Sequence, residues 1–349
     1  MTADTLAAAA TPTTPINTSI TARAGAKDGN KNAVYHEFSD SHLQAFKRDG
    51  CAVITNFLSA DEIASLRAHI STLLDAFDPT DHPMTTFATG MRDDQHIGDQ
   101  YFFDSSDKTH YFLEEDAVAN GQLVVDTRRA INKIGHGLHI DDPAFNALTH
   151  SERVRHIVRE LGYEDPRVLQ SMVICKQPKI GGAVPLHQDS TFLFTRPLSA
   201  CGFWIALEDC TLTNGCLEVI PGSHLSTPIT RRFVRTRRPS SAADAEKADT
   251  PGGNEMIDIE SVFSLFPPVR DSGKTEPPVP NSDALPECIP IEVKAGALVL
   301  IHGQVLHRSS HNHSDKSRWI YTFHIVDGTY DYDERNWLQM PAGTQLTKL

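Results

Sequence analysis

Two residues that lie two positions apart, His187 and Asp189, have side chains that suit a shared metal ion. On an extended strand such side chains point to the same side, so an imidazole and a carboxylate can approach one ion together. A second histidine would complete the two-histidine, one-carboxylate ligand set of non-haem Fe(II) oxygenases, and His307 is the candidate. The same stretch contains three other histidines, His302, His311 and His313. Because a His-x-Asp pair alone is weak evidence, the metal hypothesis depends on the rest of the sequence.

A further chemically informative residue, Arg318, begins a segment with strand-like alternation. This alternation predicts that Arg318, Ile320, Thr322 and His324 share one face of a strand. An arginine on the inward face of a β-rich core is costly unless it meets an anion, and its planar guanidinium suits a carboxylate. The pattern therefore indicates a carboxylate partner for Arg318.

The elements that must position these residues are mainly strands, preceded by helices. Ser59 and Glu62 form a capping box before apolar residues at helical spacing, which predicts a helix over about 60–77. The spacing from Val154 to Leu161 predicts a second helix, with Gly162 as its stop signal. Short β-type runs separated by turn residues then predict a β-sandwich or barrel. These runs are 167–176, 201–207, 216–220, 297–301 and 318–326.

Composition narrows the classes of function. The chain has 349 residues and a formal net charge of -13, which works against a nucleic-acid partner and against an anionic membrane surface. The six cysteines include no Cys-x-x-Cys pair, so a zinc ribbon and a redox motif are excluded and a reducing compartment is indicated. No apolar run is long enough to predict a membrane span. A basic cluster is interpreted as a solvated loop face rather than a patch for an anionic substrate tail; it contains Arg231, Arg232, Arg235, Arg237 and Arg238.

One domain is expected over 36–345. Residues 1–35 are predicted to be a disordered tail, with a mitochondrial transit peptide as the less favoured alternative. A long insertion at about 226–290 is dense in Pro, Ser, Gly and charge, which is typical of a functional lid or a disordered segment. The expected compartment is the cytoplasm, although Thr347-Lys348-Leu349 differs from the peroxisomal Ser-Lys-Leu signal only at its first position.

An ordered series of motifs resembles the phytanoyl-CoA dioxygenase family, and within it the phytanoyl-CoA dioxygenase domain-containing protein 1 subgroup. The series covers nearly all of 40–340. Its members are Asp107-Lys108, Ile131 to His136, Asp142 to Phe145, Gln170-Ser171-Met172, Lys176-Gln177-Pro178 with Gly181-Gly182, His187-Gln188-Asp189, Asn214 to Leu217, Ile220 to His224, and His307 eleven residues before Arg318.

The resemblance implies a mainly β fold with flanking helices, a double-stranded β-helix or jelly roll, that holds Fe(II) and 2-oxoglutarate. By position, it implies that His187, Asp189 and His307 bind iron, and that Arg318, with Ser309 beside it, binds the distal carboxylate of 2-oxoglutarate. Further cosubstrate contacts fall on Lys133, Met172 and Trp204. For Met172 and Trp204, core packing is an equal alternative, and Lys133 could instead lie at the surface. The histidines at 302, 311, 313 and 324 are expected near the site or in solvent rather than as ligands.

The reaction that the resemblance implies is hydroxylation of a C–H bond by O2, coupled to decarboxylation of 2-oxoglutarate to succinate, with ascorbate as a candidate reductant. The resemblance predicts a hydroxylase rather than a halogenase, because Asp189 provides a carboxylate where related halogenases have Gly or Ala. The expected substrate is a small organic or lipid-like molecule, and the overall acidity does not favour a CoA ester. Two alternatives stay open: a catalytically silent jelly-roll metal-binding protein and a hydrolytic zinc enzyme.

Overall fold

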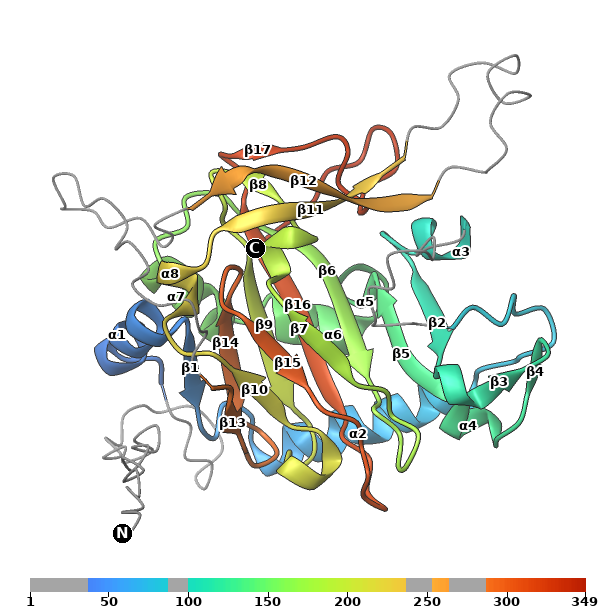
Figure 1. Cartoon of the computed structure of the whole chain (residues 1–349). Coiled ribbons are helices and arrows are strands. Elements are labelled where there is room, and N and C mark those ends of the chain that lie inside the picture. The colour runs from blue at the N-terminus through green and yellow to red at the C-terminus, as the bar shows by residue number, and fades with distance from the viewer. Residues whose placement is uncertain (1–36, 87–99, 237–252, 264–286) are drawn as a thin grey trace, which may run out of the picture. The chain divides into compact units, whose positions relative to one another are not determined.

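The computed structural model describes residues 37–86, 100–236, 253–263 and 287–349 (Figure 1). The predicted tail lies outside these residues, so both it and the domain boundaries stay predictions. Within the described part, the α-helices are α1 (Asp40–Asp49), α2 (Ala60–Asp75), α3 (Gln100–Phe103), α4 (Thr127–Ala130), α5 (Leu138–Asp141), α6 (Pro143–Thr149), α7 (Glu152–Glu160) and α8 (Ser223–Ser226). The 3-10 helices are η1 (Glu115–Ala117), η2 (Asp189–Thr191) and η3 (Leu212–Asn214).

The strands outnumber the helices, as the sequence predicts. They are β1 (Cys51–Ile54), β2 (Thr109–Leu113), β3 (Val118–Ala119), β4 (Gln122–Leu123), β5 (Ile131–His136), β6 (Pro166–Ile174), β7 (Val184–His187), β8 (Thr195–Arg196), β9 (Cys201–Ala206), β10 (Leu217–Val219), β11 (Ile229–Arg235), β12 (Asn254–Val262), β13 (Ile289–Ile291), β14 (Leu298–His302), β15 (His307–Ser309), β16 (Ile320–Asp327), β17 (Asp331–Tyr332) and β18 (Thr347–Lys348).

Two antiparallel sheets form the jelly roll. The larger has the order β1-β14-β9-β16-β6-β5-β2, with β18 also paired to β6. The smaller has the order β13-β10-β15-β7. Several neighbours, such as β1 and β14 or β7 and β15, are distant in sequence, which is expected of a double-stranded β-helix and requires long-range pairing. The predicted mainly β class with flanking helices is confirmed.

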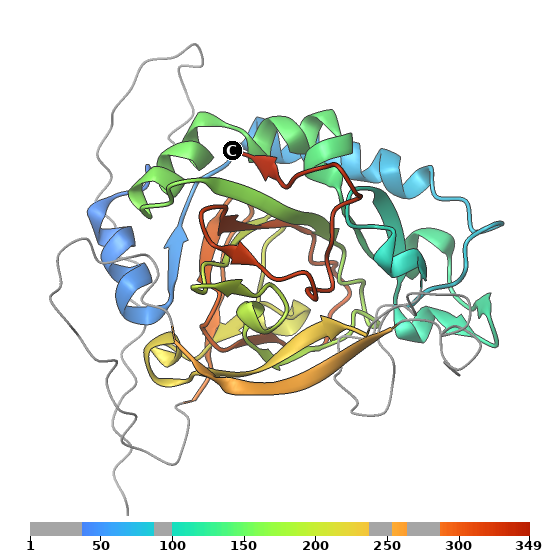
Figure 2. The same ribbon diagram turned by 90° about the horizontal axis from the view of Figure 1, so that it is seen from above.

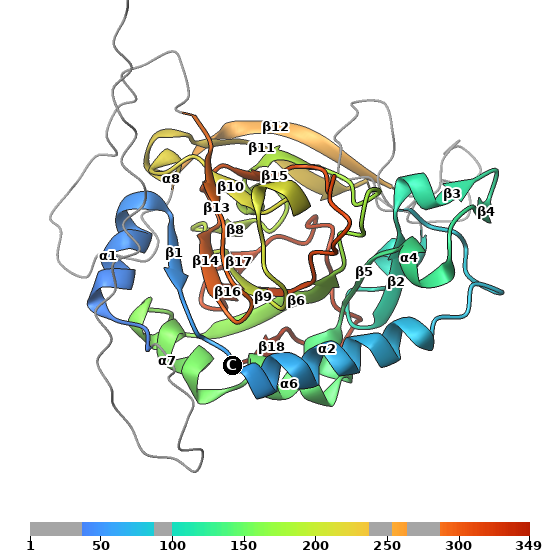
Figure 3. The same cartoon turned by 90° about the horizontal axis from the view of Figure 1, so that it is seen from below.

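Helices cover the outer face of the larger sheet (Figure 3). The predicted helix over 60–77 is α2, and its capping box is formed: the backbone N–H of Glu62 donates to Ser59 Oγ at 3.2 Å, and Ser59 N–H donates to Glu62 Oε2 at 2.8 Å. Its buried residues, together with those of α6 and α7, pack against outward side chains of β9 and β16. The second predicted helix is α7, after which Gly162 adopts a φ of +86°.

Alternation along β16 divides its side chains between the two faces of the sheet. Tyr321, Phe323 and Ile325 belong to the core beneath the helices, whereas Thr322 and His324 line an interior cavity. Arg318 lines the same cavity just before β16 begins. The predicted common face for Arg318, Thr322 and His324 is therefore present.

Part of the predicted insertion is an ordered hairpin. Strand β11 pairs with β12, and Figure 2 shows the pair on the side of the smaller sheet, opposite the helices. The interpretation of the basic cluster as a solvated loop face is wrong for Arg232, which is buried and bonded to Asp333 and Asn336. Arg231 and Arg235 also lie on the hairpin, each with a partner in the chain, and Arg237 and Arg238 lie outside the described residues.

Candidate functional site

The pairing of two short strands brings His187 and His307 together. In the antiparallel pair β7 and β15 they are direct cross-strand partners, and their ring centroids lie 4.1 Å apart. Asp189 follows at the start of η2, where its Oδ1 is 3.4 Å from His187 Nε2 and 3.5 Å from His307 Nε2. One ligand atom from each residue lies within 4.8 Å of the others. The three predicted ligands thus form one cluster.

Hydrogen bonds fix which ring nitrogens face this cluster. Nδ1–H of His187 donates to the carbonyl of Pro185 at 2.8 Å, and Nδ1–H of His307 donates to that of Val305 at 3.0 Å. Both Nε2 atoms therefore point toward Asp189 with a lone pair for a metal ion. Asp189 Oδ1 is the carboxylate oxygen that faces both Nε2 atoms, so it is the ligand atom that this residue offers. This donor set fits a divalent transition metal.

The charges of the cluster are strongly coupled. Burial, together with the charge of His187, lowers the pKa of His307 to about 4, so this imidazole is neutral at physiological pH, as a metal ligand must be. Burial alone would lower the pKa of His187, but its contact with Asp189 raises the pKa instead. Burial alone would raise the pKa of Asp189, but His307 and His324 hold it well below the ordinary value. The carboxylate is therefore ionised.

His324 extends the cluster into the larger sheet. Its Nε2 lies 3.3 Å from Asp189 Oδ2, and its Nδ1 lies 3.2 Å from Gln170 Nε2. The amide N–H of Gln170 donates to Nδ1, so the ring hydrogen of His324 is on the nitrogen that faces Asp189. His324 thus orients the carboxylate from the side. Neither it nor Gln170 stands out in the sequence, because their role depends on pairing between β6 and β16.

The other histidines close to His307 in sequence, His302, His311 and His313, are not part of the metal-ligand cluster. His302 is buried beside Phe46 and His224, with ring centroids 5.6 and 4.8 Å away. His311 and His313 contact each other at 4.7 Å. Among the four histidines near position 307, the structure therefore brings only His307 to the pair His187 and Asp189.

At the other end of the same cavity, Arg318 is buried, and none of the described residues forms an ion pair with it. The cavity has a volume of about 250 Å³ and is lined by both the metal cluster and Arg318. Arg318 is 2 % exposed, its Nε has no hydrogen-bond partner, and its Cζ lies 5.4 Å from the ring centre of Trp204. Within the described part of the chain it forms no ion pair. Burial lowers the pKa of Arg318 below its ordinary value, although the group stays charged. A buried cation in this state calls for an anionic ligand.

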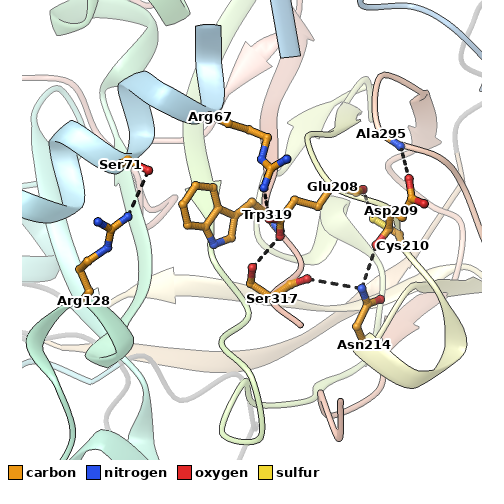
Figure 4. A network of polar contacts seen from close by, with 10 residues as sticks. All are labelled: Arg67, Ser71, Arg128, Glu208, Asp209, Cys210, Asn214, Ala295, Ser317 and Trp319. Atoms are coloured by element: carbon orange, nitrogen blue, oxygen red, sulfur yellow. Dashed lines mark hydrogen bonds and ion pairs between the residues drawn. The ribbon is translucent and has the colours of Figure 1, made fainter. Parts of the chain in front are cut away.

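A polar network holds the backbone on both sides of Arg318 (Figure 4). Glu208 Oε2 accepts from Ser317 Oγ at 2.7 Å and from the backbone N–H of Trp319 at 3.0 Å. Glu208 Oε1 accepts from Arg67 of α2 at 3.0 Å. The guanidinium of Arg318 is thereby aimed into the cavity by residues on a helix and a loop. Sequence reasoning missed Glu208 because its partners lie more than a hundred positions away in both directions.

The remaining predicted residues also line the cavity. Ser309 Oγ accepts from Lys176 Nζ at 3.0 Å. Met172 and Trp204 lie on the inward face beside Thr322, and Lys133 is 3 % exposed with Nζ 5.3 Å from the ring centre of Phe112. The surface alternative for Lys133 is therefore wrong, because β5 is buried along its whole length.

Lys176 also lines the cavity, although in the sequence it stands out only as part of a family motif with no predicted role. Its Nζ also donates to the carbonyls of Gly182 at 2.9 Å and Ser310 at 2.6 Å. Burial, together with the charge of Arg318, lowers the pKa of Lys176 to about 6. Its three acceptors fasten the loop after β6 to β15, next to Arg318.

Known proteins resemble this chain along most of its length. The family model of phytanoyl-CoA dioxygenase (PhyH) matches residues 46–320. The chain belongs to the phytanoyl-CoA dioxygenase family. It is 40% identical over 300 residues to the phytanoyl-CoA dioxygenase domain-containing protein 1 homolog of Caenorhabditis elegans, with 85% of this chain and 94% of the relative covered. It is also 40% identical over 309 residues to the Bos taurus domain-containing protein 1, with 86% and 94% covered.

Membership of this family confirms the predicted class of enzyme, a dioxygenase, and the predicted resemblance to the domain-containing protein 1 subgroup. Solved structures support the fold. The epimerase SnoN, in complex with Fe3+, alpha ketoglutarate and nogalamycin RO, has a TM-score of 0.52 and 16% identity, with 89% of this chain and 92% of SnoN covered. EctD from S. alaskensis with bound Fe has a TM-score of 0.50 and 17% identity, with 89% and 87% covered. None of the helices in the described ranges has the length and apolar character that crossing a membrane requires.

Proposed function

We propose that this phytanoyl-CoA dioxygenase family member is an Fe(II)- and 2-oxoglutarate-dependent dioxygenase that hydroxylates a C–H bond of a small organic or lipid-like molecule. Succinate and carbon dioxide are the coproducts. One observation carries the proposal: a metal-ligand cluster and a buried, unpaired arginine face the same cavity of about 250 Å³. A 2-oxo acid has one end that can chelate a metal and a carboxylate at the other end, which matches this arrangement.

His187, Asp189 and His307 would hold the iron. When bound, iron and 2-oxoglutarate supply the activation of O2, and the chain supplies binding, orientation and electrostatics. The backbone carbonyls of Pro185 and Val305 keep the imidazole lone pairs aimed at the ligand cluster. His324 holds the orientation of Asp189.

Arg318 and Ser309 would bind the distal carboxylate of 2-oxoglutarate. The incoming carboxylate supplies the counter-charge that the guanidinium lacks, and the network around Glu208 keeps the guanidinium in place for it. Lys133, Met172 and Trp204 would contact the rest of the cosubstrate from the larger sheet. Their side chains exclude water from the cosubstrate end, where an ion pair is then stronger than in solvent.

The decisive experiment is the visible charge-transfer band of the Fe(II) and 2-oxoglutarate complex, recorded without oxygen, followed by succinate release on addition of O2 and ascorbate. We expect the band in the wild type and in His302→Ala, and its loss in His307→Ala. His302 is the matched control because it is equally buried but does not reach Asp189. Metal binding without the band or succinate would favour the catalytically silent protein. Hydrolysis supported by zinc would favour the hydrolase.

We also propose that the enzyme acts in the cytoplasm. Residues 347–349, which differ from the Ser-Lys-Leu signal at the first position, are part of the fold: Thr347 and Lys348 form β18 on β6, and Lys348 Nζ lies 2.8 Å from Asp165 Oδ1. A tagged chain viewed by microscopy should show no peroxisomal pattern. A peroxisomal pattern that disappears when Leu349 is removed would contradict the proposed compartment.

A further inference from the structure

On the side away from Arg318, the cavity is walled by aromatic rings. We call this part the aromatic compartment and define it by Phe102, Phe192, Phe233 and Trp337. Phe102 stacks on Trp337 at 4.5 Å, and Phe192 contacts Phe233 at 5.5 Å. Phe192 also contacts the metal-cluster residue His187 at 6.0 Å, so a molecule in the aromatic compartment adjoins the metal centre. The compartment is not required for the metal or for the partner of Arg318.

Two of these four rings come from segments that lie far apart in the sequence and are joined by Arg232. Phe233 is on β11 in the insertion hairpin, and Trp337 is on the segment after β17. Arg232 is 1 % exposed; it donates to Asp333 at 2.5 Å and to Asn336 at 2.9 Å, and it stacks on Phe194 at 4.3 Å. These contacts hold the β11–β12 hairpin and the segment after β17 together, so the two form one wall of the compartment.

Further contacts reinforce that wall at the position of Trp337. Arg235 Nε donates to the carbonyl of Trp337 at 2.5 Å, and its backbone N–H donates to that of Arg335 at 2.8 Å. Asn336 Nδ2 donates to the carbonyl of Phe194 at 2.8 Å. The backbone that carries the indole is thus held on both sides of the ring, which is what a fixed binding wall requires.

Beside these rings the cavity is lined by two buried residues that offer acceptors, Gln170 and His136. Gln170, which is 7 % exposed, donates its N–H to His324, and its Oε1 has no hydrogen-bond partner. His136, which is 1 % exposed, lies 5.2 Å from the ring centre of Trp337. Ser105 Oγ–H donates to the carbonyl of Phe102, so Ser105 accepts from Nδ1–H of His136 at 2.7 Å and the Nε2 of His136 carries a lone pair. A ligand that donates a hydrogen bond would satisfy Gln170 Oε1 or His136 Nε2.

The basic residues that line the cavity lie at the border of this compartment or already have partners. Lys133 is at the border: it is opposite Ile174 on β6, and its Nζ lies 5.3 Å from the ring centre of Phe112, which in turn contacts Phe102. Lys176 is bound to Ser309, and Arg308 is paired with Glu218 at 2.8 Å. An anionic group in the aromatic compartment would lose its hydration against Phe102, Phe192, Phe233 and Trp337, none of which carries a charge.

We infer that the aromatic compartment binds the reacting part of the substrate and selects an uncharged group with an O–H or N–H donor for Gln170 or His136, while Arg232 holds its wall. This inference rests on the proposed function, because it takes the bound iron and 2-oxoglutarate as the neighbours of the substrate. Arg232 acts here as a positioning residue, since it contacts the wall and not the ligand.

Three matched probes test the inference: 2-phenylethanol, its methyl ether and phenylacetate. Each is titrated into the anaerobic Fe(II) enzyme with saturating 2-oxoglutarate, and binding is followed by tryptophan fluorescence and by the shift of the charge-transfer band. We expect the alcohol to bind about tenfold more tightly than the ether, because the ether leaves one buried acceptor unsatisfied. Phenylacetate should bind most weakly. Equal binding of alcohol and ether, tightest binding of phenylacetate, or no binding of any probe would overturn the inference.

Variants separate the two parts of the inference. Gln170→Met removes the free acceptor, so the preference for the alcohol should fall severalfold while the affinity for the ether is kept. Arg232→Met should weaken all three probes and change the tryptophan fluorescence, with unchanged affinity for 2-oxoglutarate. Arg231→Met is the control, since Arg231 is the neighbour on β11, is 43% exposed and pairs with Asp258. Identical probe binding in Arg232→Met and Arg231→Met would refute the role of Arg232.

A replacement variant and a control measurement ensure that each result either supports or contradicts the inference. If Arg232→Met does not fold, Asp333→Asn weakens the same ion pair from its more exposed side and takes its place. The charge-transfer band is recorded in every sample before a probe is added. Its absence in the wild type would contradict the proposed function, whereas its presence with the wrong probe preference would contradict only the inference about the substrate.

Discussion

Arg318→Met is expected to change the stability of the protein little without 2-oxoglutarate and to remove most of the stabilisation that 2-oxoglutarate gives. In the chain alone, the guanidinium is 2 % exposed and its Nε has no partner, so the folded state bears the cost of a buried, unpaired donor. Methionine has a similar length and can pack against Trp204, over which Arg318 now lies at 5.4 Å. The substitution therefore removes a destabilising feature and the ligand-binding charge at once.

The size of both effects follows from these contacts. Relief of one unsatisfied buried donor adds about 1–3 kcal/mol to the free energy of unfolding. Loss of the cation–π contact with Trp204 subtracts about 0.5–2 kcal/mol. The net change without 2-oxoglutarate is thus between about -1 and +2.5 kcal/mol. Loss of two charged hydrogen bonds to a carboxylate, at about 1.5–3 kcal/mol each, weakens 2-oxoglutarate binding by at least about a hundredfold.

Thermal unfolding of the iron-loaded protein without oxygen measures both quantities. At a concentration one hundred times its Kd, 2-oxoglutarate should stabilise the wild type by about 2.7 kcal/mol, and at that same concentration it should barely stabilise Arg318→Met. Arg308→Met is the control, because Arg308 lines the same cavity but is 47% exposed and paired with Glu218. A variant that is several kcal/mol less stable than the wild type without ligand, and that still responds to 2-oxoglutarate, would refute the anion site at Arg318.

Three other substitutions test separate parts of the molecule. Glu208→Gln should raise the Kd for 2-oxoglutarate by about tenfold in an isothermal titration, because it loosens the backbone beside Arg318; iron content should not change. Asp189→Ala should lower the iron content after reconstitution by at least about tenfold with unchanged circular dichroism, and retained iron would contradict the ligand cluster. Asp327→Ala should cost about 2–4 kcal/mol in urea unfolding, because Asp327 accepts from the backbone N–H groups of Glu164 and Thr329. Burial alone would raise the pKa of Asp327, but these bonds lower it, so its stabilisation is present at neutral pH and is lost as the pH falls below about 4; Asp327→Ala should show less of this acid loss.

The sequence was sufficient where a local pattern determines the structure. The capping box at Ser59 and Glu62 and the apolar spacing behind it specify α2, which ends at Asp75 rather than at 77. The alternation after Arg318 predicts which side chains of β16 enter the cavity, because each face of a strand meets one environment. His187 and Asp189 are close in sequence, so their common direction needs little tertiary information.

Residues whose roles depend on distant partners could not be identified in this way. Arg232 looked like one member of a charged run, yet its partners are about a hundred positions away at Asp333 and Asn336. Nothing near Glu208 in the sequence indicates that it supports Trp319, and nothing near Lys133 shows that β5 is buried. Charge density and polarity describe the average surroundings of a segment, whereas an ion pair inside a jelly roll depends on strand order.

The metal cluster and the aromatic compartment are connected through one chain of polar contacts. Asp189, held in its ionised form, faces Nε2 of His324, which places the ring hydrogen there and leaves Nδ1 as an acceptor. Gln170 must then donate its N–H to Nδ1, which leaves Oε1 as a buried acceptor without a partner in the cavity wall. In the inferred substrate site this amide supplies the acceptor for the donor group of the ligand. Gln170→Met should therefore reduce the preference for the alcohol while the iron content stays unchanged, because the three metal ligands are kept.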